Sequence, residues 1–219
     1  MHVTGWHCLV CAATVDIAAP FPWRCPNSTS WDRHHVLAIV NGPGWTPDFP
    51  NQELIDHEMP AVQPHDLMEN PFISHDAQLA WAAYADAHGI DAHGRRSIVE
   101  ELDNAVRRVD GVGFAPTPFE RSEALSEALG FVDGGGIWVK DETGGVAGSQ
   151  KARHLFTILL HLIAAEHLGH LVDRPPLAIA SCGNAALAAA TLAAAADWPI
   201  DVYVPTWMSD GFGSELDRL

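Results

Sequence analysis

Lysine is almost absent from this sequence. Ten of the twelve basic residues are arginines, and the two lysines are Lys140 and Lys151. The 28 acidic residues outnumber the basic ones, which leaves a formal net charge of −16. That charge disfavours a nucleic-acid backbone or an anionic membrane surface as partner, and its simplest consequence is solubility. We therefore expect neither nucleic acid nor membrane among the partners.

A secretory signal is also missing, because "MHVTGWHCLVC" has neither a basic n-region nor an apolar h-region. The most apolar window, "LAIASCGNAALAAATLAAAA", is interrupted by Ser181, Gly183 and Asn184. A strand, a turn and a helix explain this window better than a membrane span. Four cysteines, three of them near the start, fit reduced thiols or a metal knuckle better than a disulfide scaffold. We expect a cytoplasmic protein.

The length of 219 residues and the apolar fraction of 47% suit one full domain with a small appendage. Residues 1–30 are expected to form a small separate knuckle. Residues 31–140 are expected to be irregular at first, with "NGPGWTPDFPN" as a loop, and then helical, ending in a strand. Residues 141–219 are expected to form an α/β domain.

Regular elements are predicted from residue 76 onward. Helices are expected over 76–89, 97–111, 121–130, 150–167 and 184–196, with a further helix starting near the end. Ser97 and Glu100 have the spacing of a capping box, and one face of that helix is apolar: Ile98, Leu102, Val106 and Val109. Strands are expected at "GIWVK", "PLAIAS" and "IDVYVP". Their alternation with helices predicts an α/β fold with an open, mostly parallel sheet in three layers.

Lys151 lies directly after the Gly-rich stretch "TGGVAGSQ" and at the start of a predicted helix. Ser149 is placed as the N-cap, so Lys151 falls in the first turn. The positive end of the helix dipole disfavours a cation there and favours the neutral amine, which is the form that makes a Schiff base. The same helix end attracts anions such as phosphate or carboxylate. A solvated surface lysine is the alternative, whereas a P-loop is excluded because Ala152 follows the lysine.

A second candidate site is "SCGN", residues 181–184, between a predicted strand and a predicted helix. Ligands of open parallel α/β sheets bind at the carboxyl ends of strands, where such turns lie. Hydroxyl and amide groups at a helix start can bind a carboxylate and a ring hydroxyl. The alternative is an ordinary turn in which Asn184 caps the helix.

Four segments in order, "APTPFERSEALSEALG", "WVKDE", "SQK" and "SCGN", resemble the fold-type II pyridoxal-phosphate enzymes, the tryptophan synthase beta superfamily. Within it the chain is most similar to threonine synthase-like proteins, over residues 112–219. The resemblance implies that Lys151 binds pyridoxal 5′-phosphate covalently and moves the substrate α-proton. Ser149 would lie beside the cofactor, and Asn184 would hydrogen-bond its ring hydroxyl. Ser181 and Gly183 would receive the substrate carboxylate. Cys182 departs from the small or hydroxyl residue usual at its position.

The activity implied by the resemblance is elimination or replacement chemistry on an amino-acid substrate, threonine synthase-like. A serine/threonine ammonia-lyase is the alternative enzyme, and a non-catalytic structural or regulatory relative is the alternative of another class. The family's phosphate loop and ring-nitrogen partner lie further downstream than Leu219. We therefore expect an N-terminal fragment that is inactive alone and forms a homodimer when complete.

Cys8, Cys11 and Cys25 give the spacing C-x2-C-x13-C, and Ser28 stands where a fourth cysteine would complete a knuckle. Structural zinc takes four ligands, commonly four cysteines or three cysteines and a histidine. Threonine synthase-like proteins often begin with a similar ribbon, so residues 1–30 resemble a degenerate zinc ribbon. The candidate fourth ligands are His2, His7, His34 and His35. The alternative to a Zn²⁺ site is a relic knuckle held by packing alone.

Overall fold

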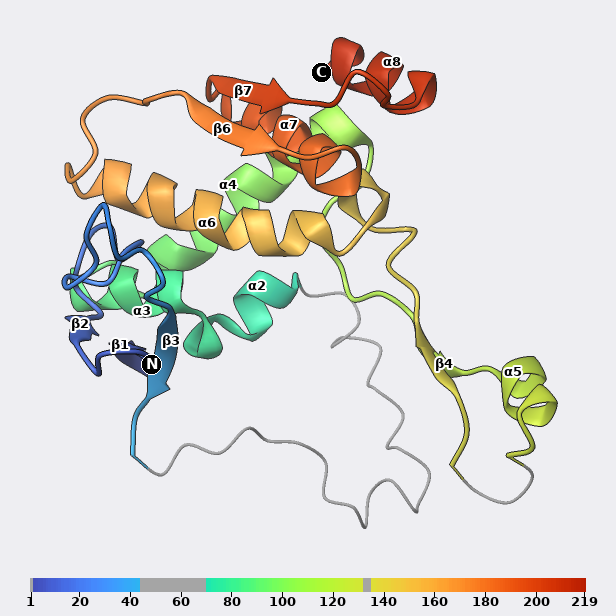
Figure 1. Ribbon diagram of the computed structural model, residues 1–219, viewed down its shortest axis with the longest axis horizontal. Helices are drawn as coiled ribbons and strands as arrows, with labels where there is room; N and C mark the ends of the chain where they lie inside the picture. The colour runs from blue at the N-terminus through green and yellow to red at the C-terminus, as the bar shows by residue number, and fades with distance from the viewer. Residues whose placement is uncertain (1, 44–69, 132–134) are drawn as a thin grey trace.

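The computed structural model describes residues 2–43, 70–131 and 135–219 (Figure 1). The described residues contain three small sheets and a hydrophobic core formed mainly by helices. Most of the loop predicted at "NGPGWTPDFPN", and the following stretch up to residue 69 for which irregular structure was expected, lie outside the described residues.

The N-terminal segment forms an antiparallel sheet in the order β2-β1-β3. Its strands are β1 (Val3–Cys8), β2 (Thr14–Asp16) and β3 (Leu37–Asn41). β3 lies in the stretch that was expected to be irregular. Its sequence "LAIVN" is short and pairs along its length with β1, so its stability depends on a partner far away in the sequence.

The helical lead-in comprises α2 (Pro71–Ser74), the 3-10 turn η1 (Asp76–Gln78), α3 (Ala80–Ala87) and α4 (Ala92–Asp110). The predicted capping box at Ser97 is wrong, because the N-cap of α4 lies six residues earlier. Asp91 is its N-cap, and the Asp91 carboxylate accepts a hydrogen bond of 2.8 Å from the backbone N–H of Gly94. The predicted apolar face is confirmed for Ile98, Leu102 and Val106, which are buried, while Val109 is half-buried.

The core lies between α3, α4, α6 (Lys151–His167) and α7 (Asn184–Ala196). Ala152, Phe156 and Leu160 recur every four residues along α6 and are fully buried. Phe156 packs against Phe114 and Phe72, with ring centroids 4.2 and 4.7 Å away. The many alanines of α7 let its backbone approach α4 and α6 closely, so this apolar helix is a core helix.

Residues 119–131 and 135–140 form an arm that extends away from this core in Figure 1. It consists of β4 (Phe119–Arg121), α5 (Glu123–Ala128) and β5 (Trp138–Lys140). The strand predicted at "GIWVK" exists as β5, but it pairs antiparallel with β4 and does not join a parallel sheet. In its described residues the connection between β4 and β5 contains one short helix, α5, and a short connection of this kind reverses the chain locally.

Parallel pairing occurs between β6 (Leu177–Ala180) and β7 (Ile200–Tyr203), joined through α7 and followed by α8 (Asp210–Arg218). The predicted open parallel sheet is therefore present only as this pair in the part of the chain that the structure describes. One face of the pair packs on α7, while its other face, which includes Ala178 and Tyr203, is exposed. The predicted third layer is not seen among the described residues, which place no helix over that exposed face.

A search of the described helices finds none that combines the length and the apolar character needed to cross a membrane. The apolar window around β6 and α7 is divided by the turn at residues 181–183, as the sequence predicted.

Candidate functional site

Lys151 is the first residue of α6, and its side chain is exposed. The regular helix has Gln150 as its N-cap residue, one position later than predicted, and Gln150 makes no side-chain cap. Ser149 is buried, and its hydroxyl accepts a hydrogen bond of 3.4 Å from the backbone N–H of Lys151. The Ser149 hydroxyl therefore accepts a hydrogen bond from the start of α6, as predicted for a capping serine, although Ser149 is not the N-cap residue.

The Gly-rich loop before Lys151 has a fixed backbone. It contains the 3-10 turn η2 (Val146–Gly148), in which Ala147 and Gly148 have left-handed φ angles of 52° and 61°. A left-handed conformation costs a residue with a Cβ roughly 1 kcal/mol or more. The backbone N–H of Ala147 points to the Asp110 carboxylate, 3.3 Å from each oxygen, which contributes to holding this conformation.

The two lysines differ in their surroundings. Lys140 donates a hydrogen bond of 2.5 Å to the backbone carbonyl of Thr117 and lies 3.8 Å from a Glu142 oxygen. The ammonium group of Lys151, by contrast, has no hydrogen-bond or ion-pair partner among the described residues. Lys151 is thus the lysine whose amine is available to a ligand.

The second predicted loop joins β6 to α7. Asn184 is the first residue of α7 and is exposed, but the N-cap position belongs to Gly183 and no side chain caps the helix. The alternative of an ordinary turn capped by Asn184 therefore does not describe this helix start. The side chains of Asn184 and Ser181 have no hydrogen-bond partner among the residues described.

The two loops lie at the same end of the helical core. α7 contacts both α6 and the turn η2, which directly precedes Lys151. Figure 1 shows the amino ends of α6 and α7 on the side toward which the strands β6 and β7 point. Backbone N–H groups at helix starts attract anions, so this end combines two anion-attracting helix termini with a free amine.

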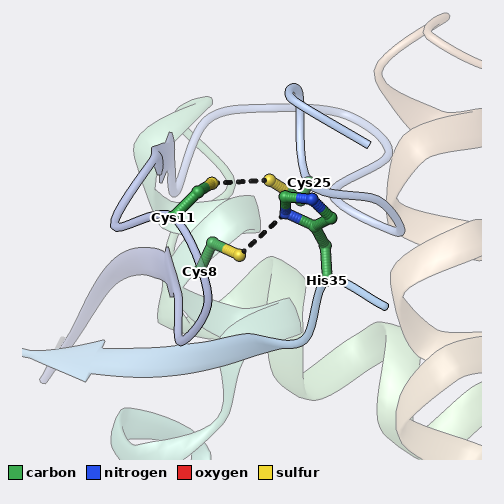
Figure 2. A group of neighbouring side chains, drawn as sticks. All are labelled: Cys8, Cys11, Cys25 and His35. Atoms are coloured by element: carbon green, nitrogen blue, oxygen red, sulfur yellow. Dashed lines mark hydrogen bonds between the residues drawn. The ribbon is translucent and has the colours of Figure 1, made fainter. Parts of the chain in front are cut away.

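A second cluster gathers in the N-terminal segment, from residues well separated in the sequence. The sulfur atoms of Cys8, Cys11 and Cys25 and a ring nitrogen of His35 all lie within 4.8 Å of one another. Figure 2 shows the four side chains converging on a common centre. The structure thus selects His35 from the four candidate histidines. Ser28 is no ligand, because its hydroxyl donates to the backbone carbonyl of Cys25 in the turn.

The geometry of this cluster suits a tetrahedral metal. The Cys11 and Cys25 sulfurs are 3.5 Å apart, and the Cys8 sulfur is 3.3 Å from His35 Nδ1. Tetrahedral zinc bonds of about 2.0 to 2.3 Å place neighbouring ligand atoms about 3.5 to 3.8 Å apart. A disulfide needs sulfurs about 2.05 Å apart, and all three cysteines are free. The four ligand atoms are therefore close enough together to share one metal ion.

Hydrogen bonds lower the pKa of the Cys8 and Cys11 thiols, whereas burial raises the pKa of the Cys25 thiol. Backbone N–H groups of Val10 and Asn27 donate to the sulfurs of Cys8 and Cys25, each over 3.4 Å. Burial raises the pKa of the Cys8 thiol, but backbone N–H groups and His35 outweigh it and bring the pKa to about 6. Hydrogen bonding to Cys8 raises the pKa of His35 to about 8.

The other ring nitrogen of His35 lies 3.4 Å from an Asp32 carboxylate oxygen. Metal-bound histidines commonly donate their second N–H to such a group, which fixes the ring orientation and leaves the first nitrogen free for the metal. Asp32 was not predicted from the sequence, and the i to i+3 spacing of Asp32 and His35 is the signal that could have indicated it.

Comparison with known proteins concerns the C-terminal part of the chain. Residues 112–218 match the family model described as pyridoxal-phosphate dependent enzyme. The match covers just under half of the chain and contains Lys151, Ser181 and Asn184. No curated protein and no solved structure matches. The resemblance to pyridoxal-phosphate enzymes is thus confirmed at the level of the family model, and the threonine synthase-like assignment remains a prediction.

The described residues fit the cofactor of that family. Pyridoxal phosphate offers an aldehyde, a ring hydroxyl and a phosphate, and this end of the core offers the Lys151 amine, the Asn184 amide and two helix termini. There is room near the backbone, since a Cβ added at Gly144 would meet no atom within 4 Å. At Gly183 the nearest atom would be Phe212 Cζ, at 3.9 Å.

Proposed function

We propose that residues 112–218 form the lysine and asparagine part of a pyridoxal-phosphate enzyme site acting on a small amino acid. One observation carries the proposal. Of the two lysines, only Lys151 has an unpartnered amine, and it stands at a helix terminus within the segment that matches the family model.

Each residue has a defined task in this proposal. The Lys151 amine holds the cofactor and afterwards carries the proton taken from the substrate α-carbon. The Asn184 amide hydrogen-bonds the ring hydroxyl. The Ser181 hydroxyl and the backbone N–H groups at Gly183 bind the substrate carboxylate. When bound, pyridoxal phosphate supplies the electron sink that makes the α-proton acidic.

The reaction we propose is elimination or replacement of the threonine synthase type, and the enzyme would be a cytoplasmic homodimer. Serine/threonine ammonia-lyase chemistry is the alternative and would use the same residues, so release of ammonia from serine or threonine separates the two. A structural or regulatory relative without cofactor is the remaining alternative.

Cofactor binding can be tested by labelling, because the chain has only two lysines with which pyridoxal phosphate can form a Schiff base. The protein is incubated with pyridoxal phosphate, reduced with borohydride and mapped by peptide mass spectrometry. We expect the pyridoxyl group on Lys151, and Lys140, which is engaged by Thr117 and Glu142, serves as the internal control. Labelling of Lys140 instead, or of neither lysine, would contradict the proposal.

We also propose that Cys8, Cys11, Cys25 and His35 bind one structural Zn²⁺. The close approach of their four ligand atoms favours this over a knuckle held by packing alone. Metal analysis should find about one zinc per chain, and Cys11→Ser should lose it and lower the melting temperature. Metal-free wild-type protein with unchanged stability after zinc addition would leave only the packed knuckle.

A further inference from the structure

The Gly-rich loop that carries Lys151 is closed at its base by an ion pair. Glu142 precedes the loop and Arg153 follows it in the first turn of α6, and Arg153 Nε donates to Glu142 Oε2 over 2.7 Å. Both side chains are largely buried, with 17% of the Glu142 side chain and 25% of the Arg153 side chain exposed. An ion pair at this degree of burial is screened less than one on the surface.

A third segment joins the pair. The Thr117 hydroxyl donates a hydrogen bond of 2.6 Å to the other Glu142 carboxylate oxygen. The second guanidinium nitrogen of Arg153 donates to the backbone carbonyl of Ala115 over 2.8 Å and approaches the Thr117 hydroxyl at 3.3 Å. The two oxygens of Glu142 and two nitrogens of Arg153 are thus all used within one network.

The charge state of Glu142 agrees with this network. Burial raises the pKa of its carboxyl, but hydrogen bonds from Arg153 and Thr117 outweigh burial and hold the pKa below its ordinary value. Glu142 is therefore ionised at neutral pH and pairs with Arg153.

We propose that Glu142, Arg153 and Thr117 form a clamp that positions Lys151 for the cofactor, a positioning role distinct from the roles of the residues that touch it. The inference rests on the proposed function of Lys151. Opening the Glu142–Arg153 pair frees the base of the loop from residue 143 to residue 152, and the first turn of α6 can then fray. The amine then samples many positions, and the loss of its preorganised position weakens cofactor binding.

The helix offers a matched control at its other end. Glu166 and Arg174 form a two-pronged ion pair, with Nε and Nη2 of Arg174 each 2.7 Å from a Glu166 oxygen. Their side chains are 31% and 33% exposed, so this pair is also partly buried, though more exposed than the clamp. Both pairs anchor α6 to a neighbouring segment, but only the first lies at the end that carries Lys151.

The experiment compares Glu142→Gln, Arg153→Gln and Glu166→Gln in the absence and presence of pyridoxal phosphate. In cofactor-free protein, amide hydrogen exchange over residues 143–152 should speed up by about tenfold or more in the two clamp variants. Glu166→Gln should leave exchange in this loop unchanged and speed it near residues 166–174. Unchanged loop exchange in both clamp variants would overturn the clamp, whether or not the wild type binds the cofactor.

Cofactor affinity then tests the consequence. The dissociation constant of pyridoxal phosphate, from a fluorescence titration, should rise about 10- to 100-fold in Glu142→Gln and in Arg153→Gln. The double variant should show no further rise, because each single substitution already removes the same Glu142–Arg153 ion pair. Glu166→Gln should bind like the wild type. A looser loop with unchanged affinity would overturn the positioning role. A wild type that binds no cofactor would refute the proposed function, and hydrogen exchange would still decide the clamp.

Discussion

His161, on α6, donates a hydrogen bond from its Nε2 to the backbone carbonyl of Pro20, 2.6 Å away. The ring is buried, lies 4.3 Å from the Tyr84 ring and meets Trp23 edge-on at 5.1 Å. Pro20 belongs to the segment between Cys11 and Cys25. The helix that begins with Lys151 therefore also holds the N-terminal cysteine segment in place.

This contact predicts a loss of stability in mild acid. Burial lowers the pKa of His161 below its ordinary value of 6.5, although its bond to Pro20 opposes the shift. The unfolded chain then takes up a proton more readily than the folded one as the pH falls. The stabilisation is complete above about pH 6.5 and is lost as the pH drops toward the lower folded-state pKa.

Urea unfolding at about pH 7.5 and about pH 5.5 measures the effect, with His161→Gln as the reference. Glutamine can donate to the same carbonyl but does not titrate. The wild type should lose more free energy of unfolding between the two pH values than the variant does. Equal losses would show that other groups account for the pH dependence.

Arg95 should contribute more to the stability of the helical lead-in than an exposed charged residue does. It is 6% exposed and pairs with Asp76 at 3.1 Å and Asp86 at 3.0 Å, and it donates to the backbone carbonyl of Ile90. Arg95→Met should lower the free energy of unfolding by about 2 to 3 kcal/mol. This is less than for a fully buried pair, because half of the Asp86 side chain is exposed.

The neighbouring Arg96→Met is the control in chemical denaturation. Arg96 forms an exposed pair with Glu100 at 3.6 Å, so its loss should cost about 0.5 kcal/mol or less. Similar losses of unfolding free energy in Arg95→Met and Arg96→Met would contradict the expectation that the buried arginine contributes more than the exposed one.

His35 should decide metal binding in the N-terminal segment. His35→Ala removes one of four ligands and should reduce zinc content or affinity markedly, whereas His35→Cys offers a four-cysteine set and should retain about one ion. His34→Ala is the matched control, because His34 is exposed and lies outside the cluster. Equal zinc content in the His35→Ala and His34→Ala proteins, by elemental analysis, would exclude His35 as a ligand.

Asn184 separates a ligand-binding loop from a structural turn. Since Gly183 occupies the N-cap position, Asn184→Ser and Asn184→Asp should each change the free energy of unfolding by about 0.5 kcal/mol or less. If Asn184 hydrogen-bonds the cofactor, both changes should shift the absorbance of the bound cofactor. In a form of the protein that turns over substrate, the rate should fall about ten- to a hundredfold, the effect of losing a hydrogen bond to a charged group. Thermal melts beside spectra and rates are the measurement, and wild-type spectra and rates in both variants would refute this role.

Much of the local structure could be predicted from the sequence alone. α7 spans the residues that its composition indicated, and α6, β6 and β7 lie within their predicted ranges. Helical periodicity and Gly or Pro at the ends of segments are local signals, and they are strong in this half of the chain. The motifs around Lys151 and Asn184 are likewise contiguous, so the sequence identified them as candidate sites and showed the resemblance to pyridoxal-phosphate enzymes.

Only the tertiary structure decided how distant segments meet. β5 was recognised as a strand, but its antiparallel pairing with β4 depends on how the chain reverses between them. His35 was one of four candidate histidines, and its selection depends on β1 and β3 lying side by side. The sequence shows Glu142 and Arg153 but gives no sign that they pair. Their pairing depends on how the loop between them folds, with a left-handed turn at Ala147. Pairings of this kind depend on loop closure and burial, which are properties of the whole fold and have no counterpart in residue spacing.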